Sequence, residues 1–217
     1  MNHEQARFNM IEQQIRPANV LDKGSLDLLL AIPRETFVPP AYCDMAFADC
    51  EIPLGRGATM LMPLIEARVL QAVQVKKHEK VLEVGTGSGY MAALLAAQAE
   101  QVWSIEIEPV LAETARVNLG RAGIGNVSVE TGDGLKGLPG HSPYDVIVIS
   151  GALPEVPAAL LAQLKIKGRL FAIVGEAPTM AAQLVTRIDE HNYSARTLFE
   201  TCTAGLRNAA GHRTFVF

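Results

Sequence analysis

The sequence has few cysteines and no pair of them in metal-binding spacing. Its three cysteines, Cys43, Cys50 and Cys202, are odd in number and widely separated. They form neither a disulfide framework nor a Cys-x-x-Cys zinc motif. The five histidines are scattered as well. We therefore predict no metal site and a chain that keeps its thiols reduced.

Long hydrophobic runs and an excess of positive charge are also lacking. The longest run of small apolar residues, Met91 to Ala97, is too short to span a membrane. The N-terminus lacks a charged segment followed by an apolar one, which a secretory signal would have. The formal net charge is -4, which argues against a surface for nucleic acid. These absences predict a cytoplasmic protein with no nucleic-acid or membrane partner.

The first part of the chain reads as a small helical unit. Residues 4–16 have the periodicity of an amphipathic helix, which Pro17 should stop. Asp22 can cap a second helix, and Pro63 suits the first position of a third. No segment here has the pattern of a parallel strand. We predict an N-terminal helical lobe over residues 1–78.

From residue 79 onward, short apolar runs alternate with helical stretches. The expected strands are 80–84, 102–106, 127–129, 144–149 and 169–174, and the expected helices are 90–98, 109–121 and 155–164. This alternation predicts an α/β domain over residues 79–217 with a doubly wound, mostly parallel sheet. Residues 195–201 and 213–217 read as late strands, for which an antiparallel arrangement is one option.

A glycine-rich loop separates the first of these strands from its helix. It reads Glu83-Val84-Gly85-Thr86-Gly87-Ser88-Gly89. Glycines allow a tight turn and a close approach of a ligand, and the following helix directs free N–H groups at it. A dinucleotide fingerprint, Gly-x-Gly-x-x-Gly, would need glycine at position 90, where this sequence has Tyr90. No Lys-Ser/Thr pair follows, so the loop is not a P-loop either. The loop is similar to motif I of the class I methyltransferases, with a purely structural turn as the alternative.

Two further signals lie at the ends of the next two strands. Glu106 ends the second strand, where a carboxylate can accept both ribose hydroxyls of a nucleoside. Gly132-Asp133-Gly134 follows the third strand, at the place where this fold class meets the adenine. Taken alone, the first could be a solvated glutamate and the second a tight turn. Their order at three successive strand ends favours a nucleoside site.

These motifs identify a family resemblance that covers most of residues 5–175. The segment from Val81 to Tyr90 is similar to motif I of the protein-L-isoaspartate O-methyltransferases. Further matching segments are residues 32–39, 46–49, 52–55, 132–134, 144–152 and 154–157.

The resemblance implies a sheet of the class I methyltransferase type, S-adenosylmethionine as cofactor, and methylation of isomerised aspartyl carboxylates in proteins or peptides. The cofactor-binding residues that the loop, the strand ends and the resemblance suggest are Glu83, Gly85, Thr86, Gly87, Ser88, Gly89, Tyr90, Glu106, Gly132, Asp133 and Gly134.

One departure from the family concerns the methyl acceptor. The family has a Thr-Ile-Ser-x-Pro segment before its third helix, and its serine lies where donor and acceptor meet. Here Thr59 and Pro63 match, but Leu61 stands at the serine position. Thr59 is therefore the retained catalytic candidate, although a helix cap or turn would also use its hydroxyl.

Leu61 leaves two alternative functions open. One is methylation of a more apolar small molecule, and the other is binding of S-adenosylmethionine without catalysis. A hydroxyl acceptor would need a base, for which this region offers Asp49 and Glu51, both of which could also be exposed loop residues. The sequence does not indicate an oligomeric state.

Overall fold

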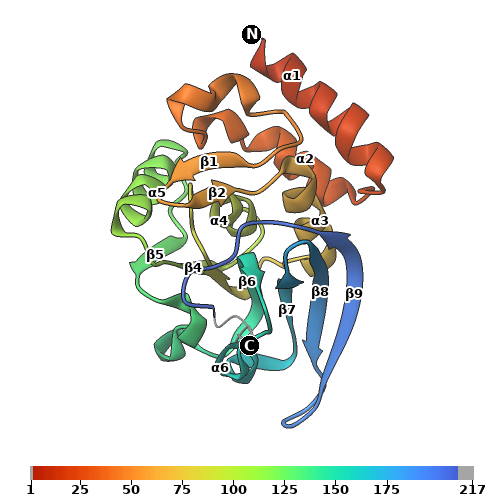
Figure 1. Ribbon diagram of the computed structural model, residues 1–217, viewed down its shortest axis with the longest axis vertical. Helices are drawn as coiled ribbons and strands as arrows, with labels where there is room; N and C mark the ends of the chain where they lie inside the picture. Colours follow the sequence, from red (N-terminus) through yellow and green to blue (C-terminus); the bar gives the residue numbers. More distant parts are fainter. Residues whose placement is uncertain (1, 210–217) are drawn as a thin grey trace, which may run out of the picture.

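The computed structural model describes residues 2–209, which fold around a seven-stranded sheet (Figure 1). The strand order is β5-β4-β3-β6-β7-β8-β9. The strands are β3 (Lys80–Val84), β4 (Gln101–Glu106), β5 (Val127–Thr131), β6 (Tyr144–Leu153), β7 (Leu164–Glu176), β8 (Thr179–Arg187) and β9 (Tyr193–Thr201). Pairs from β5 through β7 are parallel, whereas β7-β8 and β8-β9 are antiparallel. The predicted doubly wound, mostly parallel sheet is confirmed.

The order of strands reverses at β3, and this creates the place for a ligand. The chain first adds β4 and β5 on one side of β3 and then returns to add β6 on the other side. In open parallel sheets, ligands bind at such a reversal, beyond the carboxyl ends of the strands. The ends of β3 and β6 are therefore where a site is expected.

Each face of the sheet packs against its own hydrophobic core. Successive side chains of β3 point to opposite faces, so Val81 joins one core while Leu82 and Val84 join the other. The first core also contains residues of α3 (Pro63–Val73) and α4 (Tyr90–Ala96), and the second includes Leu160 of α6 (Ala158–Ala162). Helix α5 (Pro109–Arg121) packs against β4 and β5 and keeps its predicted bounds.

The N-terminal elements share the first of these cores. They are α1 (His3–Met10), a π-helical turn Ile11–Ile15, 3-10 turns Arg16–Ala18, Arg34–Thr36 and Pro40–Met45, α2 (Lys23–Ala31), β1 (Ile52–Gly55) and β2 (Ala58–Met60). The Asp22 side chain accepts the Ser25 N–H at 2.7 Å and so caps α2 as predicted. Pro63 begins α3, also as predicted.

The antiparallel hairpin β1–β2 was not predicted. Its strands have only four and three residues, too few for an alternating pattern to stand out. Gly55 and Gly57 have φ values of 82° and 77°, so the turn uses backbone conformations that suit glycine. Because of the hairpin, the lobe that was expected to be helical contributes a small sheet beside the main one (Figure 1).

Two expectations for the C-terminal half were also inexact. The helix expected over 155–164 is shorter, because Leu164 already begins β7. Strand β8 was missed, since its sequence lacks a run of β-branched residues. Residues 195–201 do lie in an antiparallel strand, β9, and residues 213–217 lie outside the described residues.

A buried ion pair fixes the segment that precedes α3. The Arg34 guanidinium donates to the Glu66 carboxylate, and both side chains are almost wholly buried. Arg34 also donates to the carbonyl oxygens of Ala46 at 2.9 Å and Leu61 at 2.6 Å. Burial raises the pKa of Glu66 to about 8, and the Arg34 charge opposes this rise. Arg34 thereby holds residues 46 and 61 in place.

Within residues 2–209, no helix has the length and hydropathy to cross a membrane.

Candidate functional site

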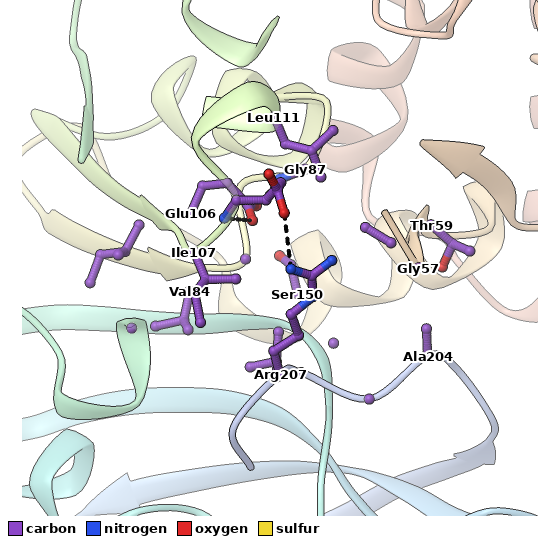
Figure 2. A pocket seen from close by; sticks show the side chains of 18 of the residues that line it. Gly57, Thr59, Val84, Gly87, Glu106, Ile107, Leu111, Ser150, Ala204 and Arg207 are labelled. Atoms are coloured by element: carbon purple, nitrogen blue, oxygen red, sulfur yellow. Dashed lines mark hydrogen bonds and ion pairs between the residues drawn. The ribbon is translucent and has the colours of Figure 1, made fainter. Parts of the chain in front are cut away.

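A cleft opens at the carboxyl ends of β3, β4 and β6, at the reversal of strand order. Its empty volume, open mouth included, is about 750 Å³. It is lined by residues 57–59, 84, 85, 87, 105–108, 111, 133–135, 150, 151 and 203–207. Figure 2 shows Glu106, Val84 and Ile107 on one side of this cleft and Thr59 and Gly57 on the other.

The glycine loop makes the tight turn that its sequence predicts, with a left-handed backbone at its three glycines. The φ values of Gly85, Gly87 and Gly89 are 93°, 53° and 88°. At Gly89 a Cβ atom would lie within about 3.4 Å of the backbone of Ala115 in α5. Helix α5 therefore approaches the loop more closely than a larger residue would allow. Gly85 and Gly87 line the cleft, so their backbone is open to a ligand.

The carboxylate of Glu106 is held at the edge of the cleft. Its Oε2 accepts the N–H of Gly87 at 2.8 Å, and its Oε1 accepts the N–H of Glu108 at 3.0 Å. Each carboxylate oxygen has a second lone pair. Glu106 can thus accept two further hydrogen bonds from a ligand, as a pair of ribose hydroxyls requires. Its predicted position at a strand end is confirmed.

Asp133 and Gly134 lie in the same cleft, on the loop after β5. The Asp133 Oδ1 atom accepts the N–H of Leu135 at 3.1 Å, and Oδ2 accepts from the Asn208 side chain at 3.1 Å. The carboxylate is therefore oriented from both sides. Gly132 does not line the cleft; its N–H donates to the carbonyl oxygen of Glu106 at 2.9 Å.

Glu83 lies behind the loop and borders a smaller adjoining cavity of about 270 Å³. The Ser104 hydroxyl donates to its Oε2 at 2.6 Å, and the Ser150 hydroxyl donates to its Oε1 at 3.0 Å. Burial raises the pKa of Glu83 to about 8, despite these two hydrogen bonds. Thr86 and Ser88 border the same cavity.

Replacing Glu83 should change how stability depends on pH. The folded state holds the Glu83 proton up to about pH 8, whereas the unfolded chain loses it near pH 4.5. The contribution of Glu83 to the free energy of unfolding is fully present below pH 4.5 and declines as the pH rises toward 8. Between pH 4.5 and 8, we expect the unfolding free energy of Glu83→Gln to decrease less than that of the wild type, by a few kcal/mol. Urea unfolding at several pH values measures it, and equal slopes for both proteins would contradict it.

Tyr90 is placed away from both cavities. Its ring packs on Phe37 with centroids 5.3 Å apart, and Arg34 lies 5.3 Å from the ring centroid. Its hydroxyl donates to the carbonyl oxygen of Ile32 at 3.4 Å. Burial raises the pKa of this phenol above its usual range. The side chain of Tyr90 thus connects α4 to the N-terminal lobe.

Thr59 lies across the cleft from Glu106 (Figure 2), whereas Leu61 does not line this cleft. Thr59 lines both cavities, and its hydroxyl donates to Glu51 Oε2 at 2.9 Å. Leu61 is 6% exposed and borders the smaller cavity. Asp49 is exposed, in keeping with a loop residue, whereas Glu51 is half-buried.

The sequence did not predict the C-terminal wall of the cleft. Residues 203–207 cross its mouth, and the Leu206 N–H donates to the carbonyl oxygen of Ala152 at 2.7 Å. Arg207, labelled in Figure 2, pairs with Glu108 at 2.9 Å. It also donates to the carbonyl oxygen of Arg56. This segment has no regular secondary structure, so no periodic pattern could have indicated it.

The fold and the cleft together define a class of protein. A glycine loop after the first parallel strand, a carboxylate ending the next strand and an acidic loop after the third surround one cleft at a strand-order reversal. This arrangement is that of a Rossmann-like nucleoside-binding domain of the class I methyltransferase type.

Comparison with known proteins identifies the family. The family model for protein-L-isoaspartate(D-aspartate) O-methyltransferase matches residues 5–205. A protein-L-isoaspartate O-methyltransferase of Koribacter versatilis is 45% identical over 181 residues, covering 83% of this chain and 81% of the relative. One of Methanoculleus marisnigri is 44% identical over 169 residues, with coverages of 78% and 77%. The chain belongs to the protein-L-isoaspartate O-methyltransferase family.

Solved structures agree with this assignment. A protein-L-isoaspartate O-methyltransferase structure superposes with a TM-score of 0.82 at 28% identity, covering 96% of this chain and 67% of that one. A β-aspartate methyltransferase of Plasmodium falciparum, solved with S-adenosyl-L-homocysteine, gives a TM-score of 0.81 at 19% identity, with coverages of 95% and 99%. The second comparison supports the fold.

Proposed function

We propose that this chain is an S-adenosylmethionine-dependent O-methyltransferase that methylates isomerised aspartyl carboxylates in proteins or peptides, as a step of protein repair. The observation that carries the proposal is one continuous cleft with a ribose-type carboxylate, Glu106, at one end and Thr59 at the other. Membership of the protein-L-isoaspartate O-methyltransferase family supports S-adenosylmethionine as the methyl donor and an isoaspartyl carboxylate as the acceptor.

The residues of the cleft suit the parts of the donor. Glu106 would accept the ribose hydroxyls, Asp133 and Gly134 would border the adenine, and Gly85 and Gly87 would let the chain of the donor pass the loop. The donor supplies a methyl group on a positively charged sulfur. Glu83, with Thr86 and Ser88, borders the smaller cavity at the amino-acid end.

The acceptor chemistry asks little of the protein beyond orientation. A carboxylate is already ionised at neutral pH, so no general base is needed. One carboxylate oxygen forms a bond to the methyl carbon, and the carbon–sulfur bond breaks to leave a neutral thioether. The lobe of residues 1–78 would supply the acceptor side, with Thr59 at the transfer point, while residues 79–217 would bind the donor. Proximity within the cleft then supplies most of the rate.

Leu61 remains the feature that would favour an apolar acceptor or mere binding of the donor. The family and its relatives favour repair methylation over both alternatives. A cytoplasmic location fits the free thiols of Cys43, Cys50 and Cys202. The partners in this proposal are aged proteins that contain isoaspartyl residues.

Leu61→Ser should raise activity on isoaspartyl peptides by up to about tenfold, because a new hydroxyl can position the acceptor carboxylate. The same change should lower stability by about 2–5 kcal/mol, since a buried leucine side chain is lost. Initial rates with a saturating donor, together with thermal melts, measure both effects. Lower activity in a variant that still folds would show that the apolar wall assists transfer.

The proposed function can be tested on a natural mixture of acceptors. Cytosolic protein aged at 37 °C accumulates isoaspartyl residues, and the enzyme with labelled donor should methylate it far more than fresh protein. The label should be released by mild alkali, because carboxyl methyl esters are labile to base. Equal labelling of fresh and aged protein would contradict the proposal.

A further inference from the structure

Three segments that are far apart in the sequence meet at the donor cleft. Arg207, in the C-terminal wall, pairs with Glu108, which directly precedes α5, at 2.9 Å, and both residues line the cleft. The Arg207 guanidinium also donates to the carbonyl oxygen of Arg56, in the turn between β1 and β2. Figure 2 shows the Arg207 side chain extending from the wall toward Gly87. We call these two contacts the Arg207 latch, which joins the wall to the hairpin and to the start of α5.

One edge of the C-terminal wall is fixed to the end of β6. Ala152 of β6 accepts the N–H of Leu206 at 2.7 Å, and its own N–H donates to the carbonyl oxygen of Ala204 at 2.9 Å. Leu206 also packs closely on glycine backbone. A Cβ atom at Gly85 or Gly151 would lie only 3.1 or 2.7 Å from the Leu206 Cδ2 atom. Main-chain hydrogen bonds and a close side-chain contact therefore hold this edge to the sheet.

The other edge is held by side chains that water can reach. The side chain of Arg207 is 46% exposed and that of Glu108 is 17% exposed. A partly exposed ion pair contributes little, because water solvates the charges and salt screens them. Asn208 adds one hydrogen bond to Asp133 at 3.1 Å, and both of these residues are exposed. This edge can therefore detach while the other stays bonded to β6.

We propose that the Arg207 latch controls the exchange of the methyl donor and its demethylated product. Arg207 keeps the wall against the hairpin and α5, and S-adenosylmethionine enters and S-adenosylhomocysteine leaves when its contacts open. The ion pair and the hydrogen bond together favour the closed wall by about tenfold. Both ligands pass the same mouth, so the latch slows entry and release alike. The inference goes beyond the proposed function, because it concerns the donor and not the acceptor.

The test measures how fast S-adenosylhomocysteine binds and leaves, by surface plasmon resonance over immobilised protein. Arg207→Gln removes the charge of the guanidinium but keeps a polar side chain. We expect the association and dissociation rate constants to rise together by about tenfold, while Kd changes less than about threefold. A direct contact between Arg207 and the ligand would instead act mainly on release. The joint rise of both rate constants therefore identifies a latch.

Further variants test the ion pair itself. Glu108→Gln breaks the pair but leaves the contact with Arg56, so both rate constants should rise about threefold. The double variant of Glu108→Gln and Arg207→Gln should not exceed Arg207→Gln alone, because both changes remove the same pair. Arg16→Gln is the matched control, since Arg16 is 48% exposed, pairs with Glu12 at 2.8 Å and does not line the cleft. It should leave both rate constants unchanged.

Unchanged rate constants in Arg207→Gln would overturn the inference, and so would faster release with unchanged association. Effects that multiply in the double variant would also overturn it, because independent contacts multiply. The wild type gives a second test: both rate constants should rise about threefold between about 0.05 and 0.5 M salt, as the ion pair is screened. Rate constants that do not depend on salt would contradict the latch. Methyl transfer plays no part in these measurements, so failure of the proposed function would leave the role of Arg207 standing.

Discussion

Glu106→Ala should weaken the binding of S-adenosylhomocysteine by about five- to 150-fold, which corresponds to about 1–3 kcal/mol. The substitution removes the partner of two ribose hydroxyls. It also frees the N–H groups of Gly87 and Glu108, which the carboxylate now accepts at 2.8 and 3.0 Å. The glycine loop would lose one of the bonds that fix it. Isothermal titration measures the affinity.

A matched control comes from the next helix. Glu113 of α5 is a mainly exposed glutamate whose carboxylate contacts Arg116. Glu113→Ala should leave the affinity unchanged.

NAD should not bind to the wild type, because the loop lacks the dinucleotide spacing. Tight binding of NAD, or an unaffected Glu106→Ala variant, would show that Glu106 does not hold a nucleoside ribose.

Gly87→Val should reduce donor affinity more than a hundredfold and still give a cooperative melt. Gly87 has a φ of 53°, and a β-branched residue there is strained by about 1–3 kcal/mol. Its side chain would also enter the space beside the cleft. The nearest atom to a Cβ is Cδ1 of Leu54, at 3.0 Å, the end of a flexible side chain. The fold can therefore adjust while the ligand cannot.

Gly120→Val is the control for this variant. Gly120 lies in α5, where a Cβ atom would meet nothing within 4 Å and φ is not left-handed. That variant should bind the donor normally. Normal binding by Gly87→Val as well would mean that the glycines serve only the turn.

Much of the donor site could be predicted because it follows regular elements. Gly85, Glu106 and Asp133 each lie at the end of a short parallel strand or within two residues of it. Parallel strands end at one edge of a sheet, so residues far apart in sequence are brought together. Hydrophobic patterning located those strands, and the site followed from them.

The acceptor side could not be predicted in the same way. Glu51 accepts a hydrogen bond from the Thr203 hydroxyl, 152 positions away, and neither residue lies in a periodic element. The hairpin that carries Thr59 is too short to show a pattern. Contacts between irregular segments depend on how the whole chain packs, which local propensities do not determine.

The central claim is that this cleft methylates isomerised aspartyl carboxylates. The most direct test compares two synthetic peptides of one sequence, one with isoaspartate and one with normal aspartate, under the same labelled donor. The account predicts rapid formation of a base-labile methyl ester on the isoaspartyl peptide and about none on the normal one. No transfer to the isoaspartyl peptide by a protein that binds the donor, or equal transfer to both, would contradict it.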